Sequence, residues 1–258
     1  MTGFKLALSF LTAIPVRTGA PQPGDLGRAG RWFPIVGLFL GAILATAYLA
    51  LLRLFSPLLA AALVVALWAA LTGGLHLDGL ADCCDSLLAT VSRERRLEIM
   101  DDPRLGAFGG IGLVLFLSLK VLAVASLPDS PQFTLHVLRF TFDASLFALL
   151  LAPPLARWLI LLVASQPMAR PGGMGAEFAL GLTPSIFILA AMIPLALTVL
   201  GGWRVLLAAA FAHLVTFVVI GVARTRLGGV TGDVFGLTVE LAELTILLTF
   251  AARVPAVP

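Results

Sequence analysis

Three aspartates lie close together in a short stretch that directly follows a long apolar run. Asp78, Asp82 and Asp85 are spaced by four and then three residues, so they share one face of a helix. Carboxylates stacked in this way repel one another, and a hard cation such as Mg2+, which takes carboxylates together with water and substrate phosphates, would remove that cost. The residues between them are apolar or small, which favours a protein-lined cavity over a solvated acidic surface. The spacing therefore predicts a metal site.

His76 stands just before these aspartates and just after Gly73 and Gly74. We expect it in the turn that the glycines make, where it could contact a phosphate or act as an acid or base; a structural role fits the sequence equally well. Zinc bound by His76, Cys83 and Cys84 is disfavoured, because their spacing matches no usual zinc pattern.

A second polar cluster precedes the last apolar run. Gly228 and Gly229 would let backbone N–H groups approach an anion, and the helix expected after Thr231 would add its N-terminus to that site. We assign these three residues to substrate binding and Asp233 to the metal. Arg104 stands just before the glycines that open another apolar run, and it is a further candidate for holding a phosphate.

Two glutamates lie inside the last apolar run, on the same side of the expected helix as Asp233. Buried carboxylates are costly unless they are paired or bound to a ligand. We assign Glu240 to substrate binding. Pairing with another helix, for example through Lys120 or Arg157, is the alternative interpretation, and for Glu243 the two are equally favoured.

Carboxylates, glycine-rich turns and a few arginines on one membrane face together indicate phosphoryl or phosphodiester transfer. Metal ions would bridge phosphate oxygens and offset the charge that develops on a leaving phosphate. Asp82, Asp85 or His76 would take the proton from an attacking hydroxyl. These residues do not by themselves name a substrate.

The elements that must position these residues are membrane helices. Of the 258 residues, 60% are hydrophobic and 12% are charged, whereas a soluble domain carries about 25% charged residues. We therefore expect the lipid bilayer as solvent and an all-α polytopic membrane protein in which residues 1–258 form a single domain. Apolar runs of about 20 residues predict about seven spans. These are 33–55, 57–75, 108–127, one within 135–165, 185–200, 203–222 and 234–251.

Basic residues are distributed unevenly between the loops. If 135–165 crosses once, eleven of them fall on the side of the N-terminus and the long loops, and four fall on the other side. They are Lys5, Arg17, Arg28, Arg31, Arg93, Arg95, Arg96, Arg104, Arg170, Arg224 and Arg226, against Arg53, Arg139, Arg204 and Arg253. This bias predicts that the candidate active site faces the cytoplasm. The positive charge thus reports topology, and we expect no nucleic acid partner.

Four separated motifs resemble those of the cobalamin synthase family, the adenosylcobinamide-GDP ribazoletransferases. They are FLTAIPV at 10–16, GGLHLDGLADCCDS at 73–86, IMDDPRLGAFG at 99–109 and LGGVTGDVFGLTVELAEL at 227–244. The resemblance covers nearly the whole chain in the same order. This chain departs from the family pattern at Ala13, Cys83, Ser86 and Asp101, while the candidate ligands all remain.

The resemblance implies a specific reaction. The family joins adenosylcobinamide-GDP to α-ribazole or its 5′-phosphate, giving adenosylcobalamin or its phosphate, and releases GMP. It needs Mg2+ and lies in the cytoplasmic (inner) membrane, where other corrinoid-assembly enzymes are candidate partners. By motif, Asp78, Asp82, Asp85 and Asp233 would hold the metal on the pyrophosphate, and Arg104 would meet a phosphate.

Three other interpretations compete with this one. Residues 78–81 resemble the start of the CDP-alcohol phosphotransferase signature, but Asp82 stands where that signature needs arginine and its later aspartates are missing. An ion-coupled transporter would use Asp143 and Lys120 with the two glutamates of the last span, but the sequence has no internal repeat. A non-catalytic scaffold for corrinoid enzymes would have no need of stacked carboxylates.

Overall fold

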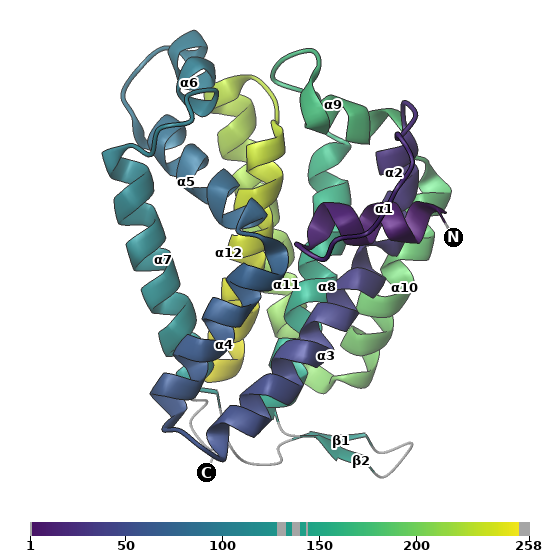
Figure 1. Ribbon diagram of the computed structural model, residues 1–258, viewed down its shortest axis with the longest axis vertical. Helices are drawn as coiled ribbons and strands as arrows, with labels where there is room; N and C mark the ends of the chain where they lie inside the picture. The colour runs from purple at the N-terminus through teal and green to yellow at the C-terminus, as the bar shows by residue number, and fades with distance from the viewer. Residues whose placement is uncertain (1, 128–132, 136–139, 143, 253–258) are drawn as a thin grey trace.

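The apolar runs form a bundle of membrane helices, because in a bilayer a helix satisfies its own backbone hydrogen bonds. The computed structural model describes residues 2–127, 133–135, 140–142 and 144–252. Asp143, Arg139 and Arg253, named in the predictions above, lie outside them. Within the described ranges, the bundle has seven long helices: α3 (Phe33–Leu52), α4 (Pro57–Thr72), α7 (Ala107–Ala125), α8 (Ala144–Ala164), α10 (Pro184–Leu200), α11 (Gly202–Leu227) and α12 (Gly232–Ala251) (Figure 1).

The number of spans agrees with the sequence prediction. In the described residues, five helices are long and apolar enough to cross a membrane unaided, and up to seven spans result when two bent helix pairs each count as one. One pair is α4 with α5 (Leu75–Leu88), bent by 93°; the other is α9 (Gly173–Leu180) with α10, bent by 99°. The all-α polytopic prediction is therefore confirmed.

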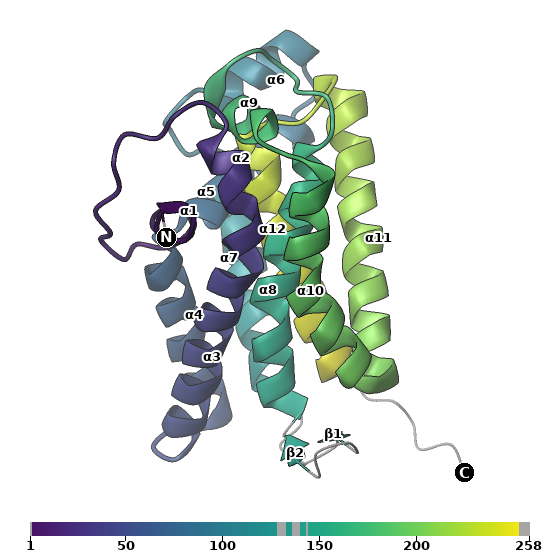
Figure 2. The same ribbon diagram turned by 90° about the vertical axis from the view of Figure 1, so that its right-hand side faces the viewer.

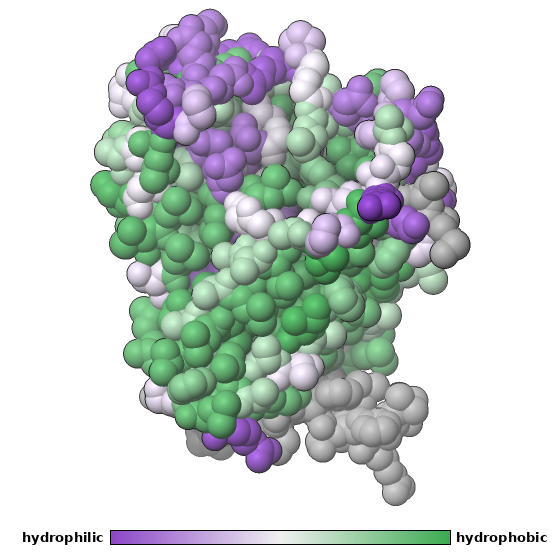
Figure 3. Space-filling view, in the orientation of Figure 1, coloured by the Kyte–Doolittle hydropathy of each residue, from purple (hydrophilic) through white to green (hydrophobic). Residues whose placement is uncertain are grey.

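The two ends of the bundle differ in character. The short helices α6 (Arg93–Met100) and α9 cover one end, while β1 (Phe133–Leu135) and β2 (Phe140–Phe142) pair antiparallel at the other (Figures 1 and 2). In the view of Figure 3, hydrophilic residues gather over α6 and near α1 (Thr2–Leu11), α2 (Asp25–Ala29) and the single turn η1 (Gly30–Trp32), and a hydrophobic band covers most of the lower part of this face.

A single helix, α8, occupies the stretch that was ambiguous in the sequence, and it continues through Pro153 and Pro154. Glycines of α3 let the two helices pack tightly there. A Cβ on Gly37 would lie 2.6 Å from the Cα of Pro154, and one on Gly41 would lie 2.7 Å from the carbonyl oxygen of Leu149. Small residues at close helix contacts are typical of membrane bundles. The proline pair is thus accommodated within one crossing.

The sharp bend between α4 and α5 depends on two glycines. Gly73 and Gly74 have φ values of 62° and 72°, a left-handed conformation that residues with a Cβ rarely adopt. The bend directs α5 away from the line of α4, so that it packs against α12 and α7. The helix that carries the three aspartates is thereby placed between the two helices that begin near it.

Candidate active site

Helices α5 and α12 meet at a contact that only small residues allow. A Cβ on Gly79 would lie 2.7 Å from the carbonyl oxygen of Asp233, and a Cβ on Gly236 would lie 2.9 Å from the carbonyl oxygen of His76. Asp233 stands in the first turn of α12. The close contact therefore brings this residue beside the aspartates of α5, although more than 140 residues separate the two stretches in the sequence.

Asp82 lies at the centre of the resulting acidic group. Its carboxylate is half-buried and experiences like-charge repulsion from Asp78, Asp233 and Asp85. In the described part of the chain, neither Asp78 nor Asp82 has a basic partner or a hydrogen bond to its carboxylate. Asp233 accepts a hydrogen bond of 3.2 Å from the hydroxyl of Thr231. The group thus carries a surplus of negative charge.

Asp85 has a partner that the sequence did not reveal. Its two carboxylate oxygens accept the backbone N–H groups of Gly106 and Gly109, each at 2.8 Å, at the first turn of α7. The first N–H groups of a helix have no partner within it, so a carboxylate that accepts them stabilises the helix start. Side chains at either glycine would collide with this carboxylate. Asp85 therefore joins α5 to α7.

His76 does not lie in the glycine turn that precedes α5, so that part of the prediction is wrong. The helix α5 begins at Leu75, and His76 lies in its first turn with 3% of its surface exposed. Its Nδ1 atom is buried without a hydrogen-bond partner in the described residues. Gly74, in a left-handed conformation, is the last residue before α5, so the turn ends before His76.

A recess opens beside the acidic group. It has a volume of about 220 Å3 and lies between α5, α12, α9, α8 and α1. His76, Asp78 and Asp233 contribute its polar lining, and Phe10, Phe178 and Phe235 contribute aromatic walls. A second hollow of about 140 Å3 adjoins it, because the two share Met174, Gly175, Gly232 and Asp233. The combined space therefore has both polar and aromatic surfaces.

The glycines before α12 have a packing role. The N–H of Gly228 donates to the carbonyl of Arg224, and a Cβ on Gly229 would lie 2.5 Å from the carbonyl oxygen of Pro167. Val230 then pairs with Met168 in a short parallel bridge. The N–H of Gly228 is therefore committed within the protein, and the expected anion cradle is not formed at that atom. Thr231 is buried and precedes the first turn of α12.

Arg104, the arginine that the sequence favoured, and Arg170 differ in their surroundings. Arg104 is exposed and bonded to Asp102, and these hydrogen bonds lower the pKa of Asp102 to about 2. Arg170 lines the smaller hollow, forms an ion pair with Asp101 and lies within electrostatic reach of Asp233. Arg170 is thus closer to the acidic group than the sequence indicated, and Arg104 points its charge at a neighbouring loop residue.

The glutamates of α12 lie in the bundle interior, where they pair with cations. Lys120 Nζ is 2.7 Å from Glu240 and 2.8 Å from Glu243, and Arg157 pairs with the other oxygen of Glu243. Lys120 also lies 4.1 Å from the centroid of the Trp68 ring. Pairing between helices, the alternative interpretation, is therefore what the structure shows for both glutamates. Glu240 does not line the recess.

The acidic group has the donor chemistry that a hard cation requires, but not a preformed cage. Among the described residues, no three His, Cys, Asp or Glu side chains converge as metal ligands would. Mg2+ usually binds proteins through only one or two carboxylates and completes its shell with water and substrate phosphates. Unpaired Asp78 and Asp82 therefore fit such an ion when a phosphate substrate supplies the remaining ligands.

Comparison with known proteins identifies the family of this chain. Residues 3–251 match the family described as cobalamin-5-phosphate synthase. The chain belongs to the cobalamin-5-phosphate synthase family. It is 43% identical over 256 residues to an adenosylcobinamide-GDP ribazoletransferase of Stutzerimonas stutzeri (strain A1501), covering 96% of this chain and 97% of the relative. Proteins with the same name from Pseudomonas aeruginosa PAO1 and Roseiflexus sp. (strain RS-1) are 42% and 38% identical, covering 95% and 96% of this chain and 96% and 89% of theirs. No solved structure matches the chain.

In this member of the cobalamin-5-phosphate synthase family, the departures from the expected motifs have local explanations. Asp101 is the ion-pair partner of Arg170. Cys83 and Ser86 are buried on the inner side of α5, where small side chains fit. Ala13 donates its N–H to the carbonyl of Leu71 at 2.8 Å, a backbone contact that any residue other than proline can make. None of these departures removes an aspartate of the acidic group.

Sequence reasoning missed the aromatic and arginine contributions to the site of this cobalamin-5-phosphate synthase family member. Phe10, Phe178 and Phe235 belong to three different helices and converge only in the fold. Arg93, which the sequence analysis counted only as a basic loop residue, donates to the carbonyl of Ala169 at 3.0 Å and lies against Gly228. The sequence offered one signal for the arginines: Arg93 and Arg170 stand in two loops that were expected on the same side of the membrane.

Proposed function

We propose that this chain is an adenosylcobinamide-GDP ribazoletransferase that acts at the last stage of cobalamin assembly. A hydroxyl of α-ribazole, or of its 5′-phosphate, attacks the phosphorus that carries the cobinamide. A new P–O bond forms, the bond that joins the two phosphates breaks, and GMP leaves with its electron pair. The products are adenosylcobalamin or its phosphate, together with GMP.

The observation that carries this proposal is the acidic junction of α5 and α12. Two stretches far apart in the sequence place unpaired Asp78 and Asp82 beside Asp233 at a recess, in a chain that matches its family from residue 3 to 251. Such surplus negative charge would repel a pyrophosphate on its own. It becomes favourable when a divalent cation is bound between the carboxylates and the phosphates.

Asp78, Asp82 and Asp233 are the residues that would hold Mg2+. When bound, the ion would offset the negative charge of the pyrophosphate. We assign the proton of the attacking hydroxyl to Asp82, because in the described residues no cation and no backbone N–H engages its carboxylate. Asp85 is less suited to this role, since both of its oxygens already accept N–H groups of α7. Its contribution is to fix α5 against α7.

The recess and its neighbouring hollow would bind the organic part of the substrates. The aromatic side chains of Phe10, Phe178 and Phe235 form one wall, and flat rings of this kind bind flat heterocycles by stacking. Arg170, at the edge of the smaller hollow, would bind a phosphate oxygen. His76 lines the same recess from the interior side, where it would orient a phosphate or the attacking hydroxyl.

The activity is tested with the full chain in lipid nanodiscs, supplied with Mg2+, adenosylcobinamide-GDP and α-ribazole. We expect GMP release that requires α-ribazole, because the phosphocobinamide group is transferred to α-ribazole and not to water. Asp82→Asn should lower the rate by about 10²–10⁴-fold, the usual contribution of a general base. The matched control is Glu98→Gln, another carboxylate-to-amide change, on an exposed residue paired with Arg95; its rate should be unchanged. Absence of GMP from the wild-type chain would refute the assignment.

We also propose that the face bearing α6 and α9 lies in the cytoplasm at the inner membrane, with other corrinoid-assembly enzymes as neighbours. The excess of basic residues on that side supports this orientation. A cysteine introduced by Glu98→Cys should react with a membrane-impermeant thiol reagent in inverted vesicles and not in intact cells. Cys83 is buried and Cys84 is half-buried, so a Cys83→Ser/Cys84→Ser background provides the blank. Labelling in intact cells would reverse the proposed topology.

A further inference from the structure

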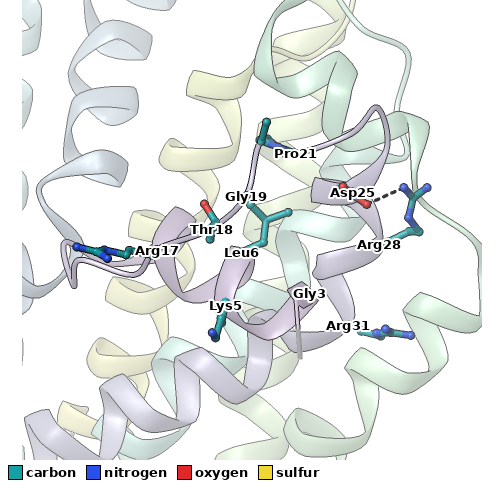
Figure 4. Close-up of a pocket in the computed structure, with 11 residues that line it drawn as sticks. Gly3, Lys5, Leu6, Arg17, Thr18, Gly19, Pro21, Asp25, Arg28 and Arg31 are labelled. Atoms are coloured by element: carbon teal, nitrogen blue, oxygen red, sulfur yellow. Dashed lines mark hydrogen bonds and ion pairs between the residues drawn. The ribbon is translucent and has the colours of Figure 1, made fainter.

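A second, basic pocket lies beside the N-terminal half of α1, apart from the acidic recess. It has a volume of about 480 Å3 and is bounded by α1, the loop that follows it, α2 and η1. Lys5, Arg17, Arg28 and Arg31 supply its charges, and Asp25 is the carboxylate among its lining residues. Figure 4 shows Arg17 and Arg31 on opposite sides, with Lys5 between them and Arg28 bonded to Asp25. Among the described residues, no lining residue is shared with the recess.

The charges of this pocket do not cancel. Arg28 is 2.7 Å from Asp25 and also donates to the carbonyl of Pro23, so this pair is neutral and locally satisfied. Lys5, Arg17 and Arg31 have no carboxylate partner within the described part of the chain. All three are exposed. The pocket therefore has a net charge of about +3 and the chemistry of a phosphate site.

An apolar groove continues from the basic pocket along the membrane surface of the bundle. Its volume is about 530 Å3, and it runs between the start of α3 and α10. Arg31 lines both spaces. The remaining lining residues include Ile35, Leu189 and Met192, and the last two are 49% and 61% exposed. In Figure 3 the hydrophilic residues of this region border the hydrophobic band. A cationic end that leads into an apolar channel matches a molecule with an anionic head and a hydrocarbon tail.

We propose that the basic pocket and this groove together bind an anionic phospholipid from the leaflet on the basic side of the membrane. The headgroup phosphate lies among Lys5, Arg17 and Arg31, and an acyl chain lies between α3 and α10. A water-soluble phosphate would use the pocket but gain nothing from the groove, which is why the lipid is the better match. Basic pockets between membrane helices bind anionic headgroups in this way. The inference is independent of the proposed reaction.

The test measures lipid binding to the delipidated full chain in detergent by native mass spectrometry. The probes are dioleoyl phosphatidylglycerol, dioleoyl phosphatidylcholine with the same chains, and glycerol 1-phosphate without chains. We expect the wild-type chain to prefer phosphatidylglycerol. Each basic residue near an anionic headgroup contributes about fivefold in affinity, so the variant Lys5→Gln/Arg17→Gln should bind it about 25-fold more weakly. Lys5→Arg/Arg17→Lys keeps both charges and should bind as the wild type does.

The matched control also removes two positive charges, but at positions outside the pocket and the groove. Arg53 and Arg224 are exposed and belong to neither pocket, so Arg53→Gln/Arg224→Gln should keep the preference for phosphatidylglycerol. Leu189→Trp, which fills the groove, should weaken binding of the long-chain lipid without removing basic charge. Melting temperatures check that every variant is folded.

Three results would overturn the proposal. One is equal binding of phosphatidylglycerol and phosphatidylcholine by the wild-type chain. Another is an undiminished preference in the Lys5→Gln/Arg17→Gln variant. The third is binding of glycerol 1-phosphate as tight as that of the lipid, which would identify a site for a soluble phosphate compound.

Discussion

The buried cluster of Lys120, Arg157, Glu240 and Glu243 gives a prediction whose size follows from its charge balance. The side chains of these four residues are at most 4% exposed, and two cations and two anions make the cluster neutral. Lys120→Met keeps the length of the side chain but leaves one uncompensated negative charge in the bundle interior. Removal of one partner of a buried ion pair costs about 3–5 kcal/mol. We expect the free energy of unfolding to fall by that amount.

A compensating change tests whether charge balance is the cause. Lys120→Met/Glu240→Gln restores neutrality, because Arg157 and Glu243 remain as a pair. We expect the double variant to recover most of the lost stability, since replacing a complete buried pair is often close to neutral. The coupling between the two substitutions should therefore be large and favourable. The assay is unfolding of the purified chain in mixed micelles, followed by tryptophan fluorescence, for the two single variants and the double variant.

The same variants decide between the two interpretations of Glu240. A structural role predicts that Glu240→Gln lowers stability while KM for adenosylcobinamide-GDP stays unchanged in the folded fraction. A substrate-binding role predicts a raised KM with little loss of stability. If the loss of stability in the double variant equals the sum of the losses in the two single variants, the charge-balance reasoning is refuted. If Glu240→Gln raises KM without lowering stability, Glu240 belongs to the substrate site.

Three further predictions concern the acidic junction. Gly79→Ala places a Cβ 2.7 Å from a backbone oxygen of Asp233 that has little freedom to move, so it should cost about 1–3 kcal/mol and slow GMP release; a full-rate, fully stable variant would contradict the close contact. Asp85→Ala removes the cap of α7 and should lower stability by about 0.5–2 kcal/mol, whereas Asp85→Asn, which still accepts a hydrogen bond from Gly106, should lose less; equal losses would mean that capping is not its role. Chelation by EDTA should abolish GMP release and added Mg2+ should restore it, and full activity in EDTA would exclude the proposed cation.

Much of the fold could be predicted because membrane helices leave a strong signal in composition. Apolar runs of the right length marked all seven long helices, and the prediction of a single crossing within 135–165 matches α8. The sharp bends were harder to predict. Gly73 and Gly74 were read as a turn, but nothing in their types fixes the 93° angle that sends α5 toward α12. The direction of a helix after a bend depends on packing partners that are distant in the sequence.

For the candidate site, the sequence could indicate which acidic residues lie near one another but not which partners they have. Spacing placed Asp78, Asp82 and Asp85 on one helical face, and the fold sets them near Asp233. Spacing could not say that Asp85 accepts two N–H groups, because its partners belong to another helix, 21 and 24 residues away. For the same reason Gly228 and Gly229 were read as an anion cradle, although Gly228 lies against Arg93 and Gly229 lies against the chain at Pro167.

The sequence shows acidic side chains beside apolar residues on both α5 and α12, but in the fold one group is paired with cations and the other is not. Around Glu243, two cations from α7 and α8 cancel two anions, so no charge remains for a ligand. Around Asp82 the negative charges exceed the positive ones. The N–H groups at the start of α7 offset the charge of Asp85, and Arg170, the nearby cation, is paired with Asp101. Asp78 and Asp82 have no such partner among the described residues. This uncompensated negative charge, next to a recess with aromatic walls, distinguishes the proposed site for a cation and a phosphate from the buried ion pairs.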